Sequence, residues 1–119
     1  MNMNDIDGAL NDIMSLNGAI ATSLIDWESG MTLGTASNGE FEIELASAGN
    51  TEVIKAKMAT MQSIGLGTSA IKDIMITLDQ QNHIIMMVPN HPELCLYGAF
   101  DNSSNLALAR NKMQSVAKA

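Results

Sequence analysis

The feature that most constrains the fold is an unbroken run of five apolar residues from Ile84 to Val88. A strand with one face in water alternates apolar and polar residues, whereas a strand covered on both faces does not need to. The run is followed by Pro89-Asn90-His91-Pro92, which cannot continue a ladder because both prolines lack an N–H. We therefore expect residues 83–88 to form a central strand of a sheet that is covered on both sides.

Four other β-rich runs accompany this strand. Residues 19–26 and 31–37 flank the turn Trp27-Glu28-Ser29-Gly30 and predict a hairpin. Residues 71–80 lead into a tight turn at Gln81-Asn82, and residues 94–100 resume the β pattern after the prolines. Short connections of this kind make antiparallel pairs, so the sequence predicts a five-stranded antiparallel sheet.

Three segments have helical patterns. Residues 4–16 place apolar side chains at helical spacing, with Asn4 or Asp5 to cap the first turn and Gly18 to stop the helix. The last helix runs to the C-terminus after Asp101-Asn102-Ser103-Ser104, which offers several N-cap side chains and also matches a glycosylation sequon. In a cytosolic chain we interpret that segment as a cap.

The middle helix is predicted over about residues 40–64, where Ile54, Met58, Met61 and Ile64 follow a helical spacing. Gly49-Asn50 lies inside it, and a glycine within a helix costs about 1 kcal/mol relative to alanine. Two start points therefore remain open, near Glu40 or near Thr51 after a separate helical turn.

The resulting order is α-β-β-α-β-β-β-α, which predicts an α+β sandwich with helices on both faces of the antiparallel sheet. At 119 residues the chain is long enough for one core, and its loops are short. We expect residues 1–119 to form a single domain.

Composition excludes several classes of partner. The net charge is −7 with only six basic residues, so no basic surface for nucleic acid is expected. The apolar runs are far too short to cross a bilayer, and Asp5, Asp7 and Asp12 occupy the place where a signal peptide would be basic. We expect a cytoplasmic protein without membrane insertion.

Some residue groups resemble catalytic or metal sites, but each lacks a part that such a site needs. His91, Glu93 and Cys95 could approach a zinc ion, yet Pro92 breaks the set and a fourth ligand is lacking. Gly65-Leu66-Gly67-Thr68-Ser69 has no lysine after its second glycine and follows a helix, so a helix stop explains it better than a phosphate loop. No nucleophile has a base or a Gly-x-Ser-x-Gly turn beside it. The sequence predicts no enzyme, no metal and no cofactor.

Two apolar features are ambiguous between core and surface. Met86 and Met87 are expected in the core, whereas Met58 and Met61 fit a core or an adaptable binding surface equally well. Trp27, in the first hairpin turn, is either an exposed contact residue or a side chain that folds back over the end of the sheet.

Over its whole length the chain resembles the roadblock (dynein light chain) family. Leu16-Asn17-Gly18-Ala19-Ile20-Ala21 is similar to that family's transition from the first helix into the first strand. Residues 25–33, Ile25-Asp26-Trp27-Glu28-Ser29-Gly30-Met31-Thr32-Leu33, are similar to its first hairpin, and residues 107–113 occupy the place of its closing helix. The chain departs from the family at Gly49-Asn50 and in the longer loop between the two prolines.

The resemblance implies a profilin-like fold and a non-catalytic dimeric scaffold or regulator that binds a Ras-like small GTPase or a larger complex. It also implies a dimer, with itself or with a related chain, that uses the second helix and the third strand. The candidate interface or sheet-packing residues are Ile54, Met58, Met61, Ile74, Ile76 and Leu78.

Independently of the resemblance, an outer strand has unpaired backbone groups that a second copy can satisfy, although Lys72 and Asp79 could equally be charges that prevent this. Two other functions remain open. One is a small-molecule sensor domain of PAS-like or profilin-like fold, which needs an interior pocket. The other is a purely structural subunit of an assembly.

Overall fold

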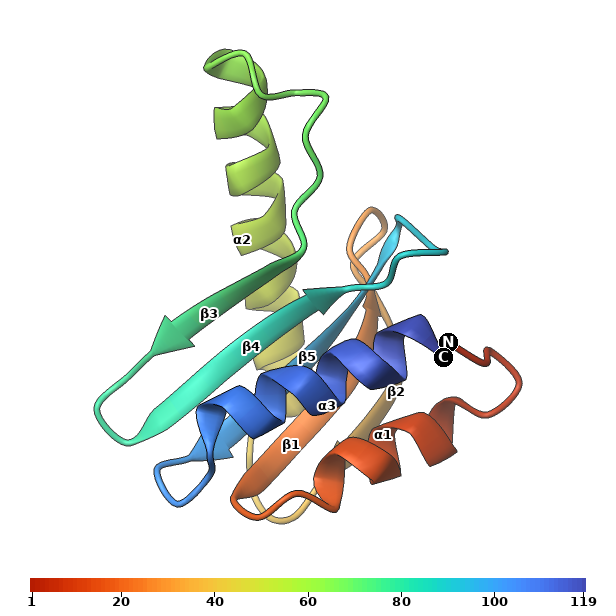
Figure 1. Cartoon of the computed structure of the whole chain (residues 1–119), viewed down its shortest axis with the longest axis vertical. Helices are drawn as coiled ribbons and strands as arrows, with labels where there is room; N and C mark the ends of the chain where they lie inside the picture. Colours follow the sequence, from red (N-terminus) through yellow and green to blue (C-terminus); the bar gives the residue numbers. More distant parts are fainter.

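The computed structural model describes all 119 residues and contains one five-stranded antiparallel sheet (Figure 1). The strand order across the sheet is β2-β1-β5-β4-β3. In chain order the strands are β1 (Ala19–Asp26), β2 (Met31–Ser37), β3 (Asp73–Thr77), β4 (Gln81–Met87) and β5 (Leu94–Asp101).

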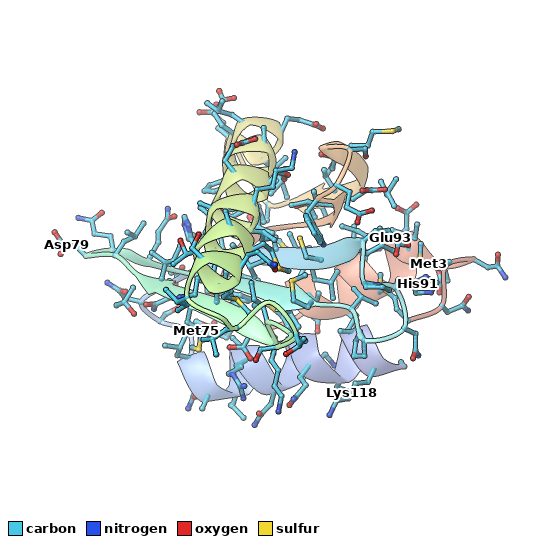
Figure 2. The ribbon with its side chains drawn as sticks, turned by 90° about the horizontal axis from the view of Figure 1, so that it is seen from above. Met3, Met75, Asp79, His91, Glu93 and Lys118 are labelled. Atoms are coloured by element: carbon cyan, nitrogen blue, oxygen red, sulfur yellow. The ribbon has the colours of Figure 1, made fainter.

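Three helices cover the two faces of this sheet: α1 (Ile6–Met14), α2 (Ile43–Ser63) and α3 (Leu106–Lys118). The helices α1 and α3 lie on one face of the sheet and pack on the same core, and α2 lies on the other face (Figure 1); Figure 2 shows α2 and α3 on opposite sides of the sheet. The order α-β-β-α-β-β-β-α and the α+β fold class predicted from the sequence are confirmed.

The sheet separates two apolar cores. The larger core, between the sheet and the α1–α3 layer, contains Leu10, Leu96 and Phe100. The smaller core lies beneath α2 and contains Ile54, Ile85 and Tyr97. Neighbouring residues of β4 therefore face different cores, which is the reason for the unbroken apolar run at Ile84 to Val88.

That run does not, however, mark the middle of the sheet. β5 is the central strand, with seven of its eight residues buried, and β4 lies between β5 and the edge strand β3. Both faces of β4 are covered, which produces the same apolar signature as a central position. The strand predicted at residues 83–88 is covered on both faces, as expected, but it is not the middle strand of the sheet; β5 holds that position.

The turn after β3 and the cap of α3 also differ from the sequence prediction. The Leu78 N–H donates to the Gln81 carbonyl at 2.8 Å, so the turn comes earlier than predicted and Gln81-Asn82 begins β4. Asn105, one residue after the predicted segment, caps α3 by accepting a hydrogen bond from the Leu108 N–H at 3.1 Å.

The helix α2 runs without a break through Gly49-Asn50. Asn50 faces the sheet and is only 8% exposed, and its side chain lies close enough to the Tyr97 hydroxyl to influence the pKa of that group. Gly49 faces open space on the other side of the helix. Tertiary contacts of this kind override a weak local propensity, so the helix begins at Ile43, near the earlier of the two start points.

Candidate interaction surface

The C-terminal part of α2 extends beyond the end of the sheet (Figure 1). The helix ends in a Schellman arrangement, in which the Leu66 N–H donates to the Met61 carbonyl at 2.7 Å and the Gly65 N–H to the Gln62 carbonyl at 3.4 Å. Gly65 has a φ of +82°, which glycine adopts without steric cost. The segment Gly65 to Ser69 is therefore the predicted helix stop.

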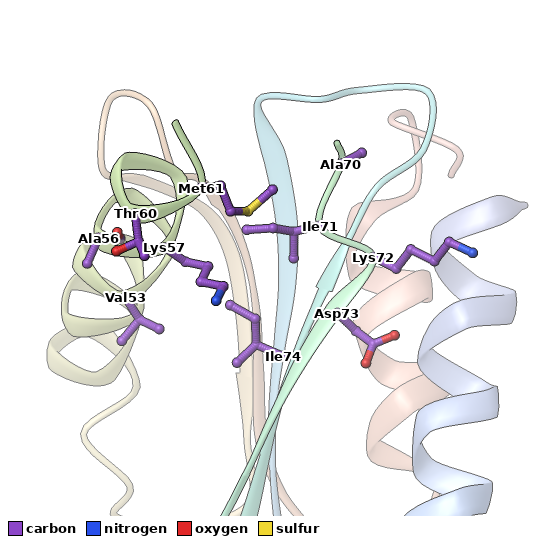
Figure 3. A pocket seen from close by; sticks show the side chains of 10 residues that line it. All are labelled: Val53, Ala56, Lys57, Thr60, Met61, Ala70, Ile71, Lys72, Asp73 and Ile74. Atoms are coloured by element: carbon purple, nitrogen blue, oxygen red, sulfur yellow. Dashed lines mark hydrogen bonds between the residues drawn. The ribbon is translucent and has the colours of Figure 1, made fainter. Parts of the chain in front are cut away.

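A groove of about 780 Å³ separates this part of α2 from the chain that enters β3 (Figure 3). In the close view Met61 and Ile71 point toward each other across it, and Lys57 points toward Ile74. Its lining residues are Val53, Ala56, Lys57, Thr60, Met61, Ala70, Ile71, Lys72, Asp73 and Ile74. We call it the α2 groove.

Beside the α2 groove, β3 is an edge strand with unused backbone groups. The Lys72 carbonyl accepts from the Met87 N–H and the Leu78 N–H donates to the Gln81 carbonyl, so the even-numbered residues bond to β4. Because antiparallel ladders alternate, the N–H and C=O groups of Asp73, Met75 and Thr77 point away from β4. These three residues form a free pairing edge.

The one acidic side chain of this edge, Asp73, forms an ion pair within the chain. Arg110 Nη2, from α3, lies 2.7 Å from Asp73 Oδ2, and the Asp73 side chain is largely buried. The two charges that the sequence suggested could oppose pairing both lie outside the strand: Lys72 immediately precedes it, and Asp79 is at the tip of the β3–β4 hairpin (Figure 2). Repulsion between copies at β3 is correspondingly weak.

The opposite edge of the sheet, β2, is protected. The register between β1 and β2 shifts between Leu24 and Ile25, which pair with Gly34 and Thr32 and leave Leu33 unpaired. A bulge of this kind twists an edge strand and interrupts its ladder, which disfavours addition of another strand. β3 is thus the edge better suited to pairing.

Eight large apolar side chains are exposed, and four of them lie at the end of α2 or along β3 and the turn after it. Ile64 is 62% exposed, Leu66 46% and Leu78 47%, and Met75 is also exposed; the other four lie on β2, at the start of α2 and on α3. Exposed apolar residues beside a groove and a free strand edge add apolar area to a surface that can bind another protein. The end of α2, the α2 groove and the β3 edge together form the candidate interaction surface.

The six residues predicted for the interface occupy different places. Met61 and Ile74 line the α2 groove, and Met58 is half-buried beside the smaller core. Ile54 is fully buried beneath α2 and is a packing residue, not a surface residue. Ile76 is half-buried on β3, whereas Leu78 lies in the turn after it. The sequence did not single out Lys57 or Ile71, because only the return of the chain after α2 places them in one groove.

Trp27 folds back over the end of the sheet. Its indole Nε1 donates to the Pro92 carbonyl at 2.9 Å, and its ring packs against the smaller core. It is half-buried, so of the two placements that the sequence left open for Trp27, exposed contact residue or side chain folded back over the sheet, the structure has the second.

A chain of polar side chains lies beneath the beginning of α2. The Tyr97 hydroxyl lies 3.2 Å from His83 Nδ1, and His83 Nε2 lies 2.9 Å from Gln81 Oε1. Burial lowers the pKa of His83. Burial also raises the pKa of Tyr97 to about 12, while the polar side chain of the nearby Asn50 acts in the opposite direction. At neutral pH these groups are uncharged and act as structural hydrogen-bond partners.

The three residues considered as zinc ligands, His91, Glu93 and Cys95, do not come together at one point. His91 Nδ1 and Glu93 Oε1 lie 3.8 Å apart on the surface, at the end of the molecule opposite Asp79 (Figure 2). Cys95 is buried in the smaller core, and burial together with the charge of Asp26 raises the pKa of its thiol to about 12. No group of three His, Cys, Asp or Glu side chains is placed to hold a metal ion.

No helix is long and apolar enough to span a membrane. No protein-family model matches the sequence, and no curated protein matches it either. The fold can nevertheless be compared with solved structures.

Several solved structures share this fold over nearly the whole chain. MglB of Myxococcus xanthus superposes with a TM-score of 0.82 at 14% sequence identity, covering 98% of this chain and 92% of MglB. A Roadblock/LC7 domain from Streptomyces avermitilis gives 0.78 at 11% identity, covering 95% and 92%. A chain of the LokiProfilin2–rabbit actin complex gives 0.61 at 14% identity, covering 98% and 95%. The chain therefore has the roadblock fold, of the profilin-like class, that its resemblance to the roadblock family implied.

Proposed function

We propose that this chain is a non-catalytic regulatory or scaffold subunit that forms a homodimer through β3 and the end of α2. The observation that carries the proposal is the free edge at Asp73, Met75 and Thr77 beside the exposed apolar end of α2. A second copy related by a two-fold axis can satisfy the same groups on both chains at once.

The proposed pairing centres on Met75, which lies opposite the partner's Met75. Asp73 then lies opposite the partner's Thr77, so no like charges face each other along the strand. The end of α2 and the α2 groove flank this edge and supply the apolar area that two short strands lack.

Self-association is also a property of one structural relative. An MglB structure that superposes at a TM-score of 0.82 and 14% identity was solved in a tetrameric arrangement. This likeness supports an oligomeric role for the present chain.

The test of the dimer is Met75→Pro, because the Met75 N–H points to the free edge and makes no bond to β4. We expect this variant to be monomeric in analytical ultracentrifugation at tens of micromolar, where the unmodified chain is a dimer, with little loss of thermal stability.

Thr35→Pro is the matched control. Thr35 lies on the edge strand β2, and its N–H also points away from the neighbouring strand because Gly34 and Ala36 are the residues that bond to β1. It should leave the dimer intact. A strictly monomeric unmodified chain, or a dimer that survives Met75→Pro and is lost in Thr35→Pro, would refute the proposed interface.

For the partner, we propose that the dimer binds a Ras-like small GTPase in the cytoplasm and changes its nucleotide cycle. The roadblock fold and the likeness to MglB, a gliding protein in Thermus thermophilus, support a regulatory role. The only arginine, Arg110, is engaged by Asp73, so an arginine finger from this chain has no support. The dimer would act by ordering the GTPase's own residues.

This part is tested by recovering a Ras-like GTPase from native cells with the immobilised chain and measuring its GTP hydrolysis with and without the dimer. A severalfold change in hydrolysis or exchange, lost with Met75→Pro, is the expected result. Binding without any change would instead indicate a purely structural subunit.

The sensor-domain alternative has less support. Both cores are filled by large side chains such as Phe100, Tyr97 and Met113, and the larger grooves open on the surface. We therefore propose no interior ligand and no cofactor.

A further inference from the structure

A second groove, of about 440 Å³, lies on the α3 side of the segment that enters β3. Ala70, Ile71 and Lys72 line both this groove and the α2 groove, so one extended segment separates the two. The remaining lining residues are Met86, Met87, Pro89, Gln114, Ala117 and Lys118. We call it the α3 groove.

The charge of the α3 groove is opposite to that of the molecule. The chain has 13 acidic and six basic residues, yet the groove is lined by Lys72 and Lys118 and by no acidic side chain. Two other basic residues are already paired, since Arg110 contacts Asp73 and Lys112 contacts Asp12, each at 2.7 Å. Lys72 and Lys118 form no ion pair, and both are exposed.

Lys118 also lies in the last turn of α3, where a cation offsets the negative end of the helix dipole. Lys72 has no such role. In Figure 3 its side chain is directed toward α3, across the space where the α3 groove lies. The two ammonium groups thus provide a positive site on an otherwise acidic protein.

The wall of the groove also offers unpaired backbone groups. Neither the N–H nor the C=O of Ala70 or Ile71 makes a hydrogen bond within the chain, and both residues lie in extended chain just before β3. A small anion could contact the lysines but would leave the carbonyls unpaired. An extended peptide carries both donors and acceptors and can satisfy this backbone as an added strand does.

From these observations we infer that the α3 groove binds an extended peptide segment of a partner protein that carries acidic side chains next to apolar ones. The acidic groups lie against Lys72 and Lys118, and the apolar side chains lie against Ile71, Met87 and Pro89, the lining residues with exposed apolar surface. The site goes beyond the proposed dimer and GTPase binding, because it uses the face of the sheet opposite α2 and needs only one copy of the chain.

The test uses a fluorescein-labelled octapeptide of alternating leucine and aspartate, with an octapeptide of alternating leucine and asparagine as the neutral comparison. Fluorescence anisotropy at low salt measures binding, and amide chemical shifts of the ¹⁵N-labelled chain locate it. We expect the acidic peptide to bind more tightly, with the largest shifts at Ala70, Ile71 and Met87, and to weaken as salt is raised.

Lys72→Glu and Lys118→Glu are each expected to weaken binding about fivefold or more, since reversal removes an attraction and adds a repulsion. Lys55→Glu is the matched control: this lysine is exposed on α2, forms no ion pair and lines neither groove. It should change the affinity by less than about twofold. Thermal unfolding of each variant verifies that the fold is kept.

Equal binding of the acidic and neutral peptides would overturn the inference. So would equal losses from Lys55→Glu and Lys72→Glu, or amide shifts confined to α2. Met75→Pro separates this inference from the proposed dimer, because a monomer that still binds the peptide supports the α3 groove. A dimer that does not bind the peptide removes the groove proposal and leaves the dimer standing.

Discussion

At the scale of single residues, the side of α2 that faces the sheet is unusually polar. Ser47, Asn50 and Thr51 are buried there beside Ile43 and Ile54. The Ser47 hydroxyl donates to the Ile43 carbonyl at 2.6 Å and lies 2.8 Å from the Ser23 hydroxyl of β1. Because Ser47 donates its hydroxyl proton to the Ile43 carbonyl, the Ser23 hydroxyl is the donor in the bond between the two serines.

This direction predicts unequal effects of two similar substitutions. Ser47→Ala leaves the Ser23 hydroxyl buried without its acceptor and should lower the free energy of unfolding by about 1–3 kcal/mol. Ser23→Ala leaves Ser47 bonded to Ile43 and should cost about 1 kcal/mol or less. Urea unfolding of both variants and of the double variant measures this. A double variant less stable than Ser47→Ala would contradict the assigned direction.

His83 predicts a pH dependence of stability. Burial holds its pKa below the ordinary value of 6.5, so the unfolded chain takes up a proton before the folded chain does. The part of the folding stability that depends on a neutral His83 is fully present above about pH 6.5. It is lost as the pH falls toward the lower pKa of the folded state. His83→Gln should reduce the decline in melting temperature between about pH 7 and pH 5, measured by thermal unfolding at both pH values.

Such residue-level details were the hardest to obtain from the sequence. Gly49-Asn50 suggested a possible break because isolated propensity ranks both residues as poor in a helix. Only the position of Tyr97 on β5 shows that Asn50 has a buried partner. Trp27 was ambiguous for the same reason, since its acceptor, the Pro92 carbonyl, lies 65 residues further along the chain.

At the scale of elements, the packing of α1 on β2 depends on a glycine. A Cβ atom at Gly34 would lie 2.8 Å from Ile6 Cγ2 and 3.2 Å from Leu10 Cδ1, both on α1. The helix therefore approaches the strand more closely than a side chain at this position would allow.

Gly34→Val should destabilise the protein by about 1–3 kcal/mol by forcing α1 away from β2. Gly49→Ala is the contrasting substitution, because a Cβ atom there meets nothing within 4 Å and alanine favours the helix. It should stabilise by about 0.5–1 kcal/mol. Denaturant midpoints of the two variants should shift in opposite directions, and a shift of both in the same direction would contradict this account of the packing.

Element order was the part of the fold that the sequence predicted well. Hydrophobic periodicity and turn residues depend on local chemistry, so the bounds of β1 and β2 were obtained as predicted. The candidate site was only partly predictable. Periodicity placed Met61 and Ile74 on the second helix and the third strand, and the roadblock resemblance implied their role. The α2 groove and its residue Ile71 depend on how the chain returns after Gly65.

At the scale of the whole molecule, the exposed end of α2 predicts a difference between monomer and dimer. Residues 62–70 are all exposed in the single chain, and exposed segments with few contacts open and are cleaved most readily. In the proposed dimer the end of α2 lies against the partner and is protected.

Chymotrypsin should therefore cut near Leu66 about tenfold faster in Met75→Pro than in the unmodified chain, as followed by mass spectrometry of the fragments. Thr35→Pro, on the opposite edge, should be cut at the unmodified rate. Equal rates in all three proteins would mean that the end of α2 is not covered by a second copy.

The segment Ala70 to Lys72 is a wall of both the α2 groove and the α3 groove. An occupant of either groove fixes the position of this wall and so changes the free energy of binding in the other groove. By thermodynamic reciprocity, any factor by which the peptide tightens or weakens the dimer is the factor by which dimerisation alters affinity for the peptide. In the proposed dimer, these three residues of extended chain couple self-association to binding in the α3 groove.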